Sequence, residues 1–151
     1  MVIERARLVI WLLLVIILIM TYSVVWQDVE QQADDAAFAV ASKRIVERAS
    51  FYRQQWLLAK QPTSLTIEQR KVHFSAKGWV LPLNEQGDMD CGYWYRVLYP
   101  EEKVLRQTPQ HISDESDLRG YICHYDYSSD QAIVMSLKNG KFLTKVVFLA
   151  R

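Results

Sequence analysis

The sequence contains an apolar run at residues 8–26 that carries no charged side chain. As a helix rising 1.5 Å per residue, this run would extend roughly 28 Å. The hydrocarbon core of a bilayer is about 30 Å thick, so a helix of this length can cross it. The run therefore predicts one transmembrane helix near the amino terminus.

Two interpretations of this run compete, a cleaved export signal and a permanent anchor. A signal peptide ends in small residues at its cleavage site. Residues 26–30, which follow the run, offer no such site, and the nearest small-x-small tripeptide, residues 37–39, lies too far along the chain. We therefore expect a retained anchor, with the cleaved signal as the alternative.

The charges at the two ends of the run predict its orientation. Arg5 and Arg7 precede it, whereas acidic residues follow it. Such a bias in Lys and Arg holds the amino terminus in the cytoplasm. We expect a cytoplasmic tail at residues 1–7, a single-pass helix at residues 8–26 in a bacterial inner membrane, and a periplasmic domain at residues 27–151.

Residues 27–60 predict a second helical stretch, because they contain neither Gly nor Pro and their apolar residues recur in steps of three or four. These apolar residues are Val29, Ala33, Ala37, Ala41, Ile45, Ala49, Tyr52 and Trp56. The dipeptide Gln61-Pro62 ends the pattern. We expect one helix from about residue 8 to residue 60, with its apolar face packed on a domain; a coiled-coil stalk is the alternative.

The region 64–151 carries strand signals. Asn139-Gly140, between two apolar runs, predicts a β-hairpin. Residues 100–119 are rich in polar and turn-forming residues and indicate a surface loop. We expect strands at residues 93–99, 120–127, 132–137 and 142–149, and a short strand or turn at residues 64–68. A long amino-terminal transmembrane-to-amphipathic helix packed on a small antiparallel sheet is an α+β fold.

The chain has two cysteines, Cys91 and Cys123. In an oxidising compartment an even pair indicates a disulfide, and by chain entropy this one would contribute roughly 3–4 kcal/mol. We expect the disulfide to join two neighbouring strands. Two unpaired buried thiols are the alternative.

No pattern in the sequence indicates an enzyme, so we expect no catalytic residue, cofactor or metal. There is no G-x-S-x-G motif, and His73, His111 and His124 lack the spacing of metal ligands. With 18 basic and 17 acidic residues, the chain has no excess of positive charge for nucleic acid.

A membrane-anchored periplasmic ligand-binding module is the alternative function. Acidic loop residues suit calcium, and aromatic side chains suit a carbohydrate. The acidic residues are Asp88, Asp90, Asp114, Glu115, Asp117, Asp126 and Asp130, and the aromatic residues are Tyr93, Trp94, Tyr95, Tyr99, Tyr121, Tyr125 and Tyr127. For the acids a solvated loop is favoured, and for the aromatics packing on the long helix.

Four stretches resemble the MshF family, accessory proteins of the mannose-sensitive haemagglutinin (MSHA) type IV pilus. They are RARLVIWLLLVIILIMTYS, FYRQQWLLAKQP, GWVLPLN and DCGYWYRVLYP. The resemblance implies a pilin-like, non-enzymatic component of pilus biogenesis. Its partners would be other pilus-assembly proteins, namely the platform protein and minor pilins, and it would bind no cofactor.

One departure from polymerising pilins is expected to keep the chain in the membrane. A prepilin has a Gly before its cleavage point, whereas the first Gly here is Gly78, and Glu4 is followed by Arg5 and Arg7 rather than by apolar residues. Arginines are expensive to bury in a fibre core. For contact with a partner helix we expect the small residues Ala33, Ala37 and Ala41.

Overall fold

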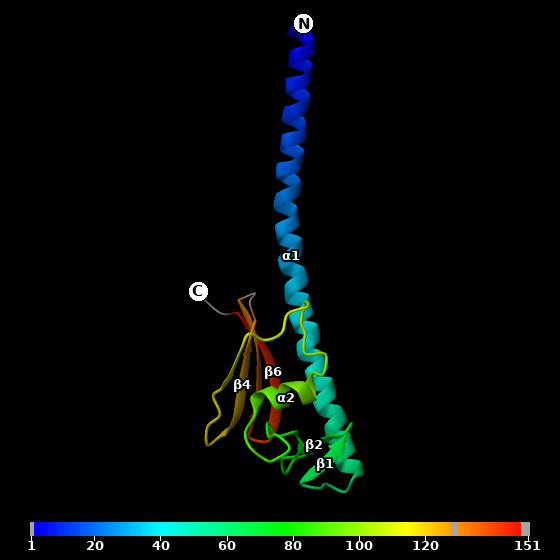
Figure 1. Cartoon of the computed structure of the whole chain (residues 1–151), viewed down its shortest axis with the longest axis vertical. Helices are drawn as coiled ribbons and strands as arrows, with labels where there is room; N and C mark the ends of the chain where they lie inside the picture. The colour runs from blue at the N-terminus through cyan, green and yellow to red at the C-terminus, as the bar shows by residue number, and fades with distance from the viewer. Residues whose placement is uncertain (1, 128–129, 149–151) are drawn as a thin grey trace. The chain divides into compact units, whose positions relative to one another are not determined.

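The computed structural model describes the backbone of residues 2–127 and 130–148, and the side chains of those residues except 2 and 25–33. It is an α+β protein with a long apolar amino-terminal helix and small antiparallel sheets (Figure 1). The chain divides into two units, Met1–Ala36 and Ala37–Arg151. Helix α1, Val2–Leu58, contributes residues to both units.

The predicted helix is confirmed, and its end has a clear cause. Lys60 and Gln61 adopt positive φ angles of 64° and 62°, which turn the chain out of the helix before Pro62. The Trp56 indole N–H donates to the Pro62 carbonyl at 2.9 Å. This bond holds the departing chain against the last turn of the helix.

Within the described residues six strands form two sheets, and all of their pairings are antiparallel. The strands β1 (Ser64–Ile67) and β2 (Arg70–His73) form a two-stranded sheet. The larger sheet has the order β3-β4-β5-β6. Its strands are β3 (His111–Asp114), β4 (Gly120–Asp126), β5 (Gln131–Lys138) and β6 (Lys141–Phe148).

The predicted hairpin is confirmed. Lys138 pairs with Lys141 across the two-residue turn, where Asn139 and Gly140 have φ angles of 52° and 71°. Two positive φ angles in succession are the conformation that Asn-Gly favours. The predicted strands at residues 120–127, 132–137 and 142–149 correspond to β4, β5 and β6, while residue 149 lies outside the described part of the chain.

The strand predicted at residues 93–99 is wrong, because Cys91–Leu98 forms the helix α2. The Asp90 carboxylate caps its first turn by accepting the Tyr93 backbone N–H at 2.7 Å. The buried residues Cys91, Trp94, Tyr95 and Leu98 follow a helical spacing. Aromatic side chains suggested a strand, but the cap and this spacing favour a helix.

The surface loop predicted at residues 100–119 is also incomplete, since it contains β3. This four-residue strand pairs with β4 from His111↔Asp126 to Asp114↔Cys123. Its only large apolar residue is Ile112, so its own pattern of side chains is too short to indicate a strand.

The core of the second unit lies between α1, α2 and one face of the larger sheet. Phe38, Ile45 and Tyr52 of α1 are almost fully buried, as is Trp94 of α2. The Phe38 and Tyr127 rings meet edge to face with their centroids 5.0 Å apart. The prediction that an apolar face of the helix packs on a domain is therefore confirmed.

Gly78 offers a test of this packing. It has φ +80°, and a Cβ atom there would lie 2.2 Å from the Trp56 ring. We expect Gly78→Ala to lower the free energy of unfolding by about 1–3 kcal/mol more than Gly87→Ala. Gly87 is the matched control because its φ is +96° and no atom lies within 4 Å of its added Cβ. Urea denaturation followed by tryptophan fluorescence measures both, and equal losses would contradict the steric account.

Candidate functional site

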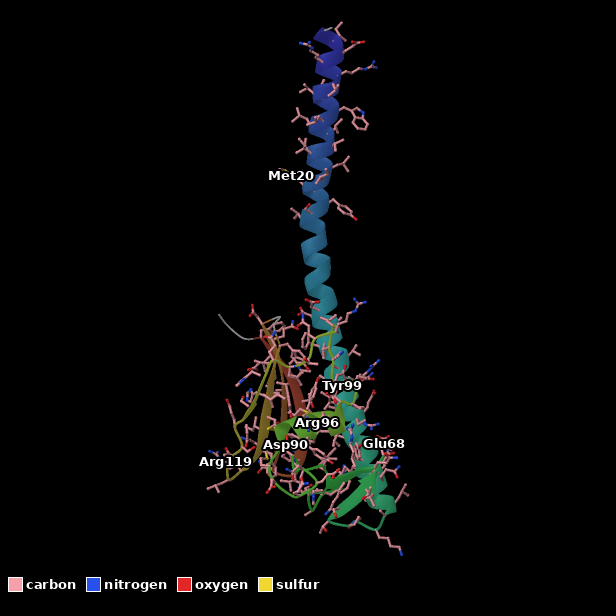
Figure 2. All side chains as sticks on the ribbon, in the orientation of Figure 1. Met20, Glu68, Asp90, Arg96, Tyr99 and Arg119 are labelled. Atoms are coloured by element: carbon pink, nitrogen blue, oxygen red, sulfur yellow. A yellow bond between two sulfur atoms is a disulfide. The ribbon has the colours of Figure 1, made fainter. Side chains whose placement is uncertain are left out.

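The first unit contains one helical segment, Ile3–Val24, that is long and apolar enough to cross a membrane. None of it is buried inside the protein. Its side chains, Met20 among them, project away from the helix (Figure 2). Because a helix satisfies its backbone hydrogen bonds internally, such a segment can enter hydrocarbon. Among the described residues it is the one segment with these properties.

The hydroxyl groups near the end of this segment are satisfied within the helix. Thr21 Oγ1 lies 3.0 Å from the carbonyl oxygens of Ile17 and Leu18, and Ser23 Oγ donates to the Ile19 carbonyl at 2.9 Å. Such bonds remove most of the cost of placing a hydroxyl in an apolar medium. The two polar residues are therefore compatible with a bilayer.

The predicted partner-contact stripe is partly covered by this chain's own core. Ala41 is only 1% exposed and belongs to the core, and Ala37 packs against that core. The chain that directly follows β4 covers α1 further along than expected, since Tyr127 already meets Phe38. A free surface is therefore contradicted for Ala41, whereas Ala37 stays partly exposed and the Ala33 side chain lies outside the described residues. Contact with a partner helix at Ala33 and Ala37 stays a prediction.

The exposed side of α1 in the second unit carries charged residues such as Lys43 and Glu47, together with some small and apolar ones. Ala39 is exposed, and Val40 is 51% exposed. Ala39 and Val40 fall outside the stripe of apolar residues that recurs in steps of three or four, so the spacing does separate this face from the buried one. The predicted contact residues were taken from the stripe that the core covers.

A hollow of about 310 Å³ lies between α1 and the chain that follows α2. It is lined by Arg44, Glu47, Arg48, Phe51, Leu98, Tyr99, Pro100 and Glu101. Arg44 pairs with Glu101 at 3.0 Å, and Arg48 pairs with Glu68. Both arginines are thus neutralised by this chain's own acids, so the hollow presents no unpaired positive charge to an anionic ligand.

A second hollow, of about 270 Å³, lies beside Trp79. The Arg53 guanidinium lies 4.8 Å from the centre of the Trp79 ring system, and the Phe142 ring stacks on Trp79 at 5.8 Å. The Trp79 indole N–H donates to the Gly140 carbonyl at 3.0 Å. Since this ring already has these partners, it is poorly placed to stack on a sugar.

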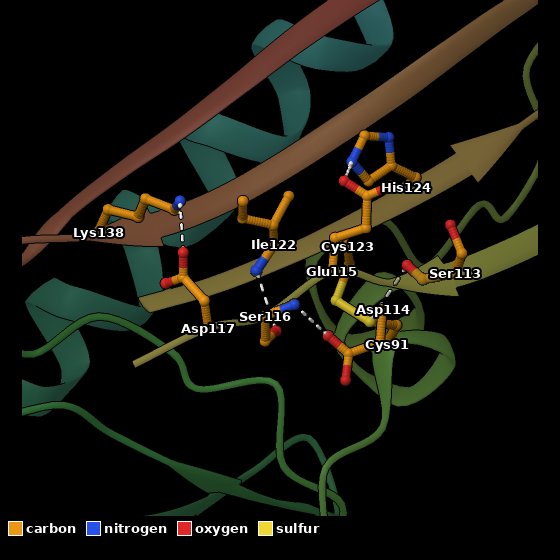
Figure 3. Close-up of polar contacts among 10 residues, drawn as sticks. All are labelled: Cys91, Ser113, Asp114, Glu115, Ser116, Asp117, Ile122, Cys123, His124 and Lys138. Atoms are coloured by element: carbon orange, nitrogen blue, oxygen red, sulfur yellow. Dashed lines mark hydrogen bonds and ion pairs between the residues drawn. A yellow bond between two sulfur atoms is a disulfide. The ribbon is translucent and has the colours of Figure 1, made fainter. Parts of the chain in front are cut away.

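The predicted disulfide between Cys91 and Cys123 is present, with a Cα–Cα distance of 5.7 Å (Figure 3). Contrary to expectation, it joins a helix to a strand, because Cys91 is the first residue of α2 and Cys123 lies in β4. Next to it, the Tyr125 hydroxyl donates to the Cys91 carbonyl at 2.7 Å. The two bonds together fix the start of α2 on the sheet.

Two acidic residues, one at the end of β3 and one just before β4, stabilise the turn between these strands. The Asp114 carboxylate accepts the Ser116 backbone N–H at 2.7 Å (Figure 3). Asp117 accepts the Arg119 backbone N–H at 2.7 Å and pairs with Lys138 at 3.5 Å. These contacts, the backbone N–H first, hold the pKa of Asp117 below its usual range.

The three histidines do not lie together as metal ligands would. His73, His111 and His124 lie in β2, β3 and β4, and His124 pairs with Glu115 at 3.1 Å (Figure 3). Within the described part of the chain, no group of three or more His, Cys, Asp or Glu side chains could hold a metal ion.

Most of the aromatic residues considered for carbohydrate are core residues. Trp94, Tyr95, Tyr125 and Tyr127 are buried, and the Tyr95 and Tyr127 hydroxyls hydrogen-bond to each other. The Tyr95 and Tyr125 rings pack with their centroids 4.7 Å apart. They contribute to stability rather than forming an exposed platform.

Comparison with protein-family models, curated proteins and solved structures found no match to this chain.

The disulfide gives a stability prediction. We expect the double variant Cys91→Ala/Cys123→Ala to lose about 3–4 kcal/mol of unfolding free energy, because the unfolded chain is no longer cross-linked. Adding a reductant to the unchanged protein should have a similar effect, and should have none on the variant. Urea denaturation measures both. Two thiols that react with maleimide in the native oxidised protein would contradict the prediction.

The buried tyrosines give a pH prediction. Burial raises the pKa of Tyr95 and Tyr125 above the ordinary value of 10.0, and raises that of Tyr127 to about 12. Above pH 10 the unfolded chain therefore loses protons that the folded chain keeps. The stabilising effect is complete below pH 10 and is lost as the pH rises beyond it.

We expect the unfolding free energy to fall steadily with pH above about 10, where ordinary tyrosines ionise. Part of the tyrosinate absorbance should appear only together with loss of the near-ultraviolet circular dichroism signal. In concentrated urea, all tyrosines should titrate in a single step. Complete ionisation of the tyrosines in the still-folded protein would contradict the prediction.

Proposed function

We propose that this protein is a non-enzymatic, membrane-anchored component of type IV pilus biogenesis of the MSHA kind. The observation that carries the proposal is that one helix, α1, includes the apolar segment Ile3–Val24 and also contributes buried core residues to a small α+β domain. A spanning helix that is also the core helix of its domain is the arrangement of pilin-like proteins. The resemblance of four sequence stretches to the MshF family supports the same assignment.

The flanking charges support an inner-membrane location with the amino terminus in the cytoplasm. Arg5 and Arg7 lie at the start of the apolar segment, and the next basic residue in the sequence is Lys43. Lys and Arg next to the first spanning helix usually stay on the cytoplasmic side. The domain would then be periplasmic, where a disulfide such as Cys91–Cys123 persists.

A structural role fits the way the polar groups are used. Asp114 and Asp117 accept backbone hydrogen bonds in the turn between β3 and β4, and Asp117 also pairs with Lys138. Most of the aromatic residues considered for carbohydrate are buried. The ligand-binding alternative needs these groups to be available, so it has less support. Pilus-platform proteins and minor pilins are the proposed partners.

Topology provides the first test. A periplasm-active reporter such as alkaline phosphatase, fused after Arg151, should be active, and a cytoplasm-active reporter at the same position should be silent. Replacing Arg5 and Arg7 with Glu should reduce the reporter activity, because it removes the positive flank. Replacing Lys43 with Glu is the matched control and should change nothing. An inactive phosphatase fusion would refute the proposed orientation.

Partner contact provides the second test, carried out in a deletion strain complemented with full-length variants. Ala39→Trp adds bulk on the exposed face of α1 and should change stability by no more than about 0.5 kcal/mol. It should weaken co-purification with platform and minor-pilin proteins and reduce surface piliation. Glu47→Trp, at another exposed position of the helix, is the control and should leave both intact.

Ala41→Leu separates contact from folding. Because Ala41 is buried in the core, the larger side chain should cost about 1–3 kcal/mol of stability. Normal piliation in the deletion strain would refute the pilus role. Piliation defects that follow the loss of stability alone across the three variants would refute a partner contact at the exposed face of α1.

A further inference from the structure

β6 is an open edge of the larger sheet. It pairs with β5 over eight consecutive residue pairs, without a bulge, and with no other strand among the described residues. It contains neither Pro nor Gly. The opposite edge, β3, has only four residues. Long regular edges readily pair with another strand, and natural proteins usually block them.

The hairpin determines which main-chain groups of β6 are free. Across a two-residue turn the flanking pair, Lys138 and Lys141, is hydrogen-bonded, and bonded pairs then alternate along an antiparallel ladder. The N–H and C=O groups that point away from β5 therefore belong to Phe142, Thr144, Val146 and Phe148. No described residue outside the sheet forms a backbone hydrogen bond with them.

On the face of the sheet that is exposed to solvent, the side chains of β6 alternate between basic and apolar. Lys141 and Lys145 are exposed, Leu143 is 52% exposed and Val147 is 40% exposed. None of the described carboxylates forms an ion pair with either lysine. Lysines on an edge disfavour pairing with a second copy of the same strand, because like charges come close together. They favour a strand that brings acids.

We propose that β6 is a docking edge for an extended segment of a partner protein, which adds a fifth strand to the sheet. The partner would place acidic residues opposite Lys141 and Lys145 and apolar residues opposite Leu143 and Val147. Its main chain would bond to the free groups of Phe142, Thr144 and Val146, giving affinity, while the alternating side chains give specificity. This surface is distinct from the α1 face and does not depend on the pilus assignment.

The probe is a fluorescent heptapeptide of sequence VTETVTE, which in antiparallel register presents its two glutamates to Lys145 and Lys141. Its control is VTKTVTK. Both are titrated against the full-length protein in detergent, with fluorescence anisotropy as the readout. We expect VTETVTE to bind at least tenfold more tightly than VTKTVTK, a preference that should shrink as salt is added.

Two variants locate the site. Lys141→Glu/Lys145→Glu should reverse the preference between the peptides. Thr144→Pro removes a backbone N–H that points away from β5, and it leaves the hydrogen bonds to β5 in place. It should therefore abolish peptide binding while circular dichroism shows that the protein stays folded. Lys103→Glu, an exposed change outside the sheet, should leave binding unchanged.

Three results would overturn the proposal. One is equal affinity, or no affinity, for the two peptides. Another is an unchanged preference between the peptides in the Lys141→Glu/Lys145→Glu variant. Both substitutions are at exposed positions and should leave the fold intact, so this result counts even if Thr144→Pro does not fold. The third is a dimer of the unchanged protein that Thr144→Pro converts to monomer, since this would show that a second copy occupies the edge.

Discussion

The packing of one face of α1 against α2 and the larger sheet is the contact on which the rest of the second unit depends. Phe38, Ile45 and Tyr52 fill the space between the layers, while Ala41 and Ala49 keep that space narrow. At the end of the face, Trp56 lies against Gly78 and holds the chain as it leaves the helix. Without α1, the core face of the sheet would lose much of its apolar cover, at a cost of about 25 cal/mol per Å² exposed.

The sequence predicted the parts of the fold that depend on local signals. The absence of Gly and Pro predicted α1, and Asn139-Gly140 predicted the β5–β6 hairpin. α2 was misassigned because its aromatic residues favour strands on average, whereas the Asp90 cap acts at one specific position. β3 could not be recognised from its own residues, since a four-residue edge strand owes its conformation to the neighbour it pairs with.

The candidate contact surface shows the same limit. Spacing alone placed Ala37 and Ala41 on one stripe, but it could not say whether a partner or the chain's own sheet would cover them. In the structure Ala41 is buried in this chain's own core, and Ala37 packs against that core. Conversely, the disulfide was predictable because two cysteines allow only one intramolecular pair, although the elements that it joins were not. Which main-chain N–H and C=O groups of β6 lack a partner depends on the order of the strands in the sheet, and no local sequence pattern indicates that order.

These observations indicate what kind of recognition the second unit can support. Its arginines near the larger hollow are paired with acids of the same chain, and the Trp79 ring already has an arginine and an aromatic partner. Groups that are already satisfied gain little from a ligand, because binding must first replace existing contacts. The main-chain groups along the edge of β6 have no protein partner to give up among the described residues. A strand that binds there forms new main-chain hydrogen bonds without breaking any among the described residues, which is why the proposed fifth strand is placed at this edge.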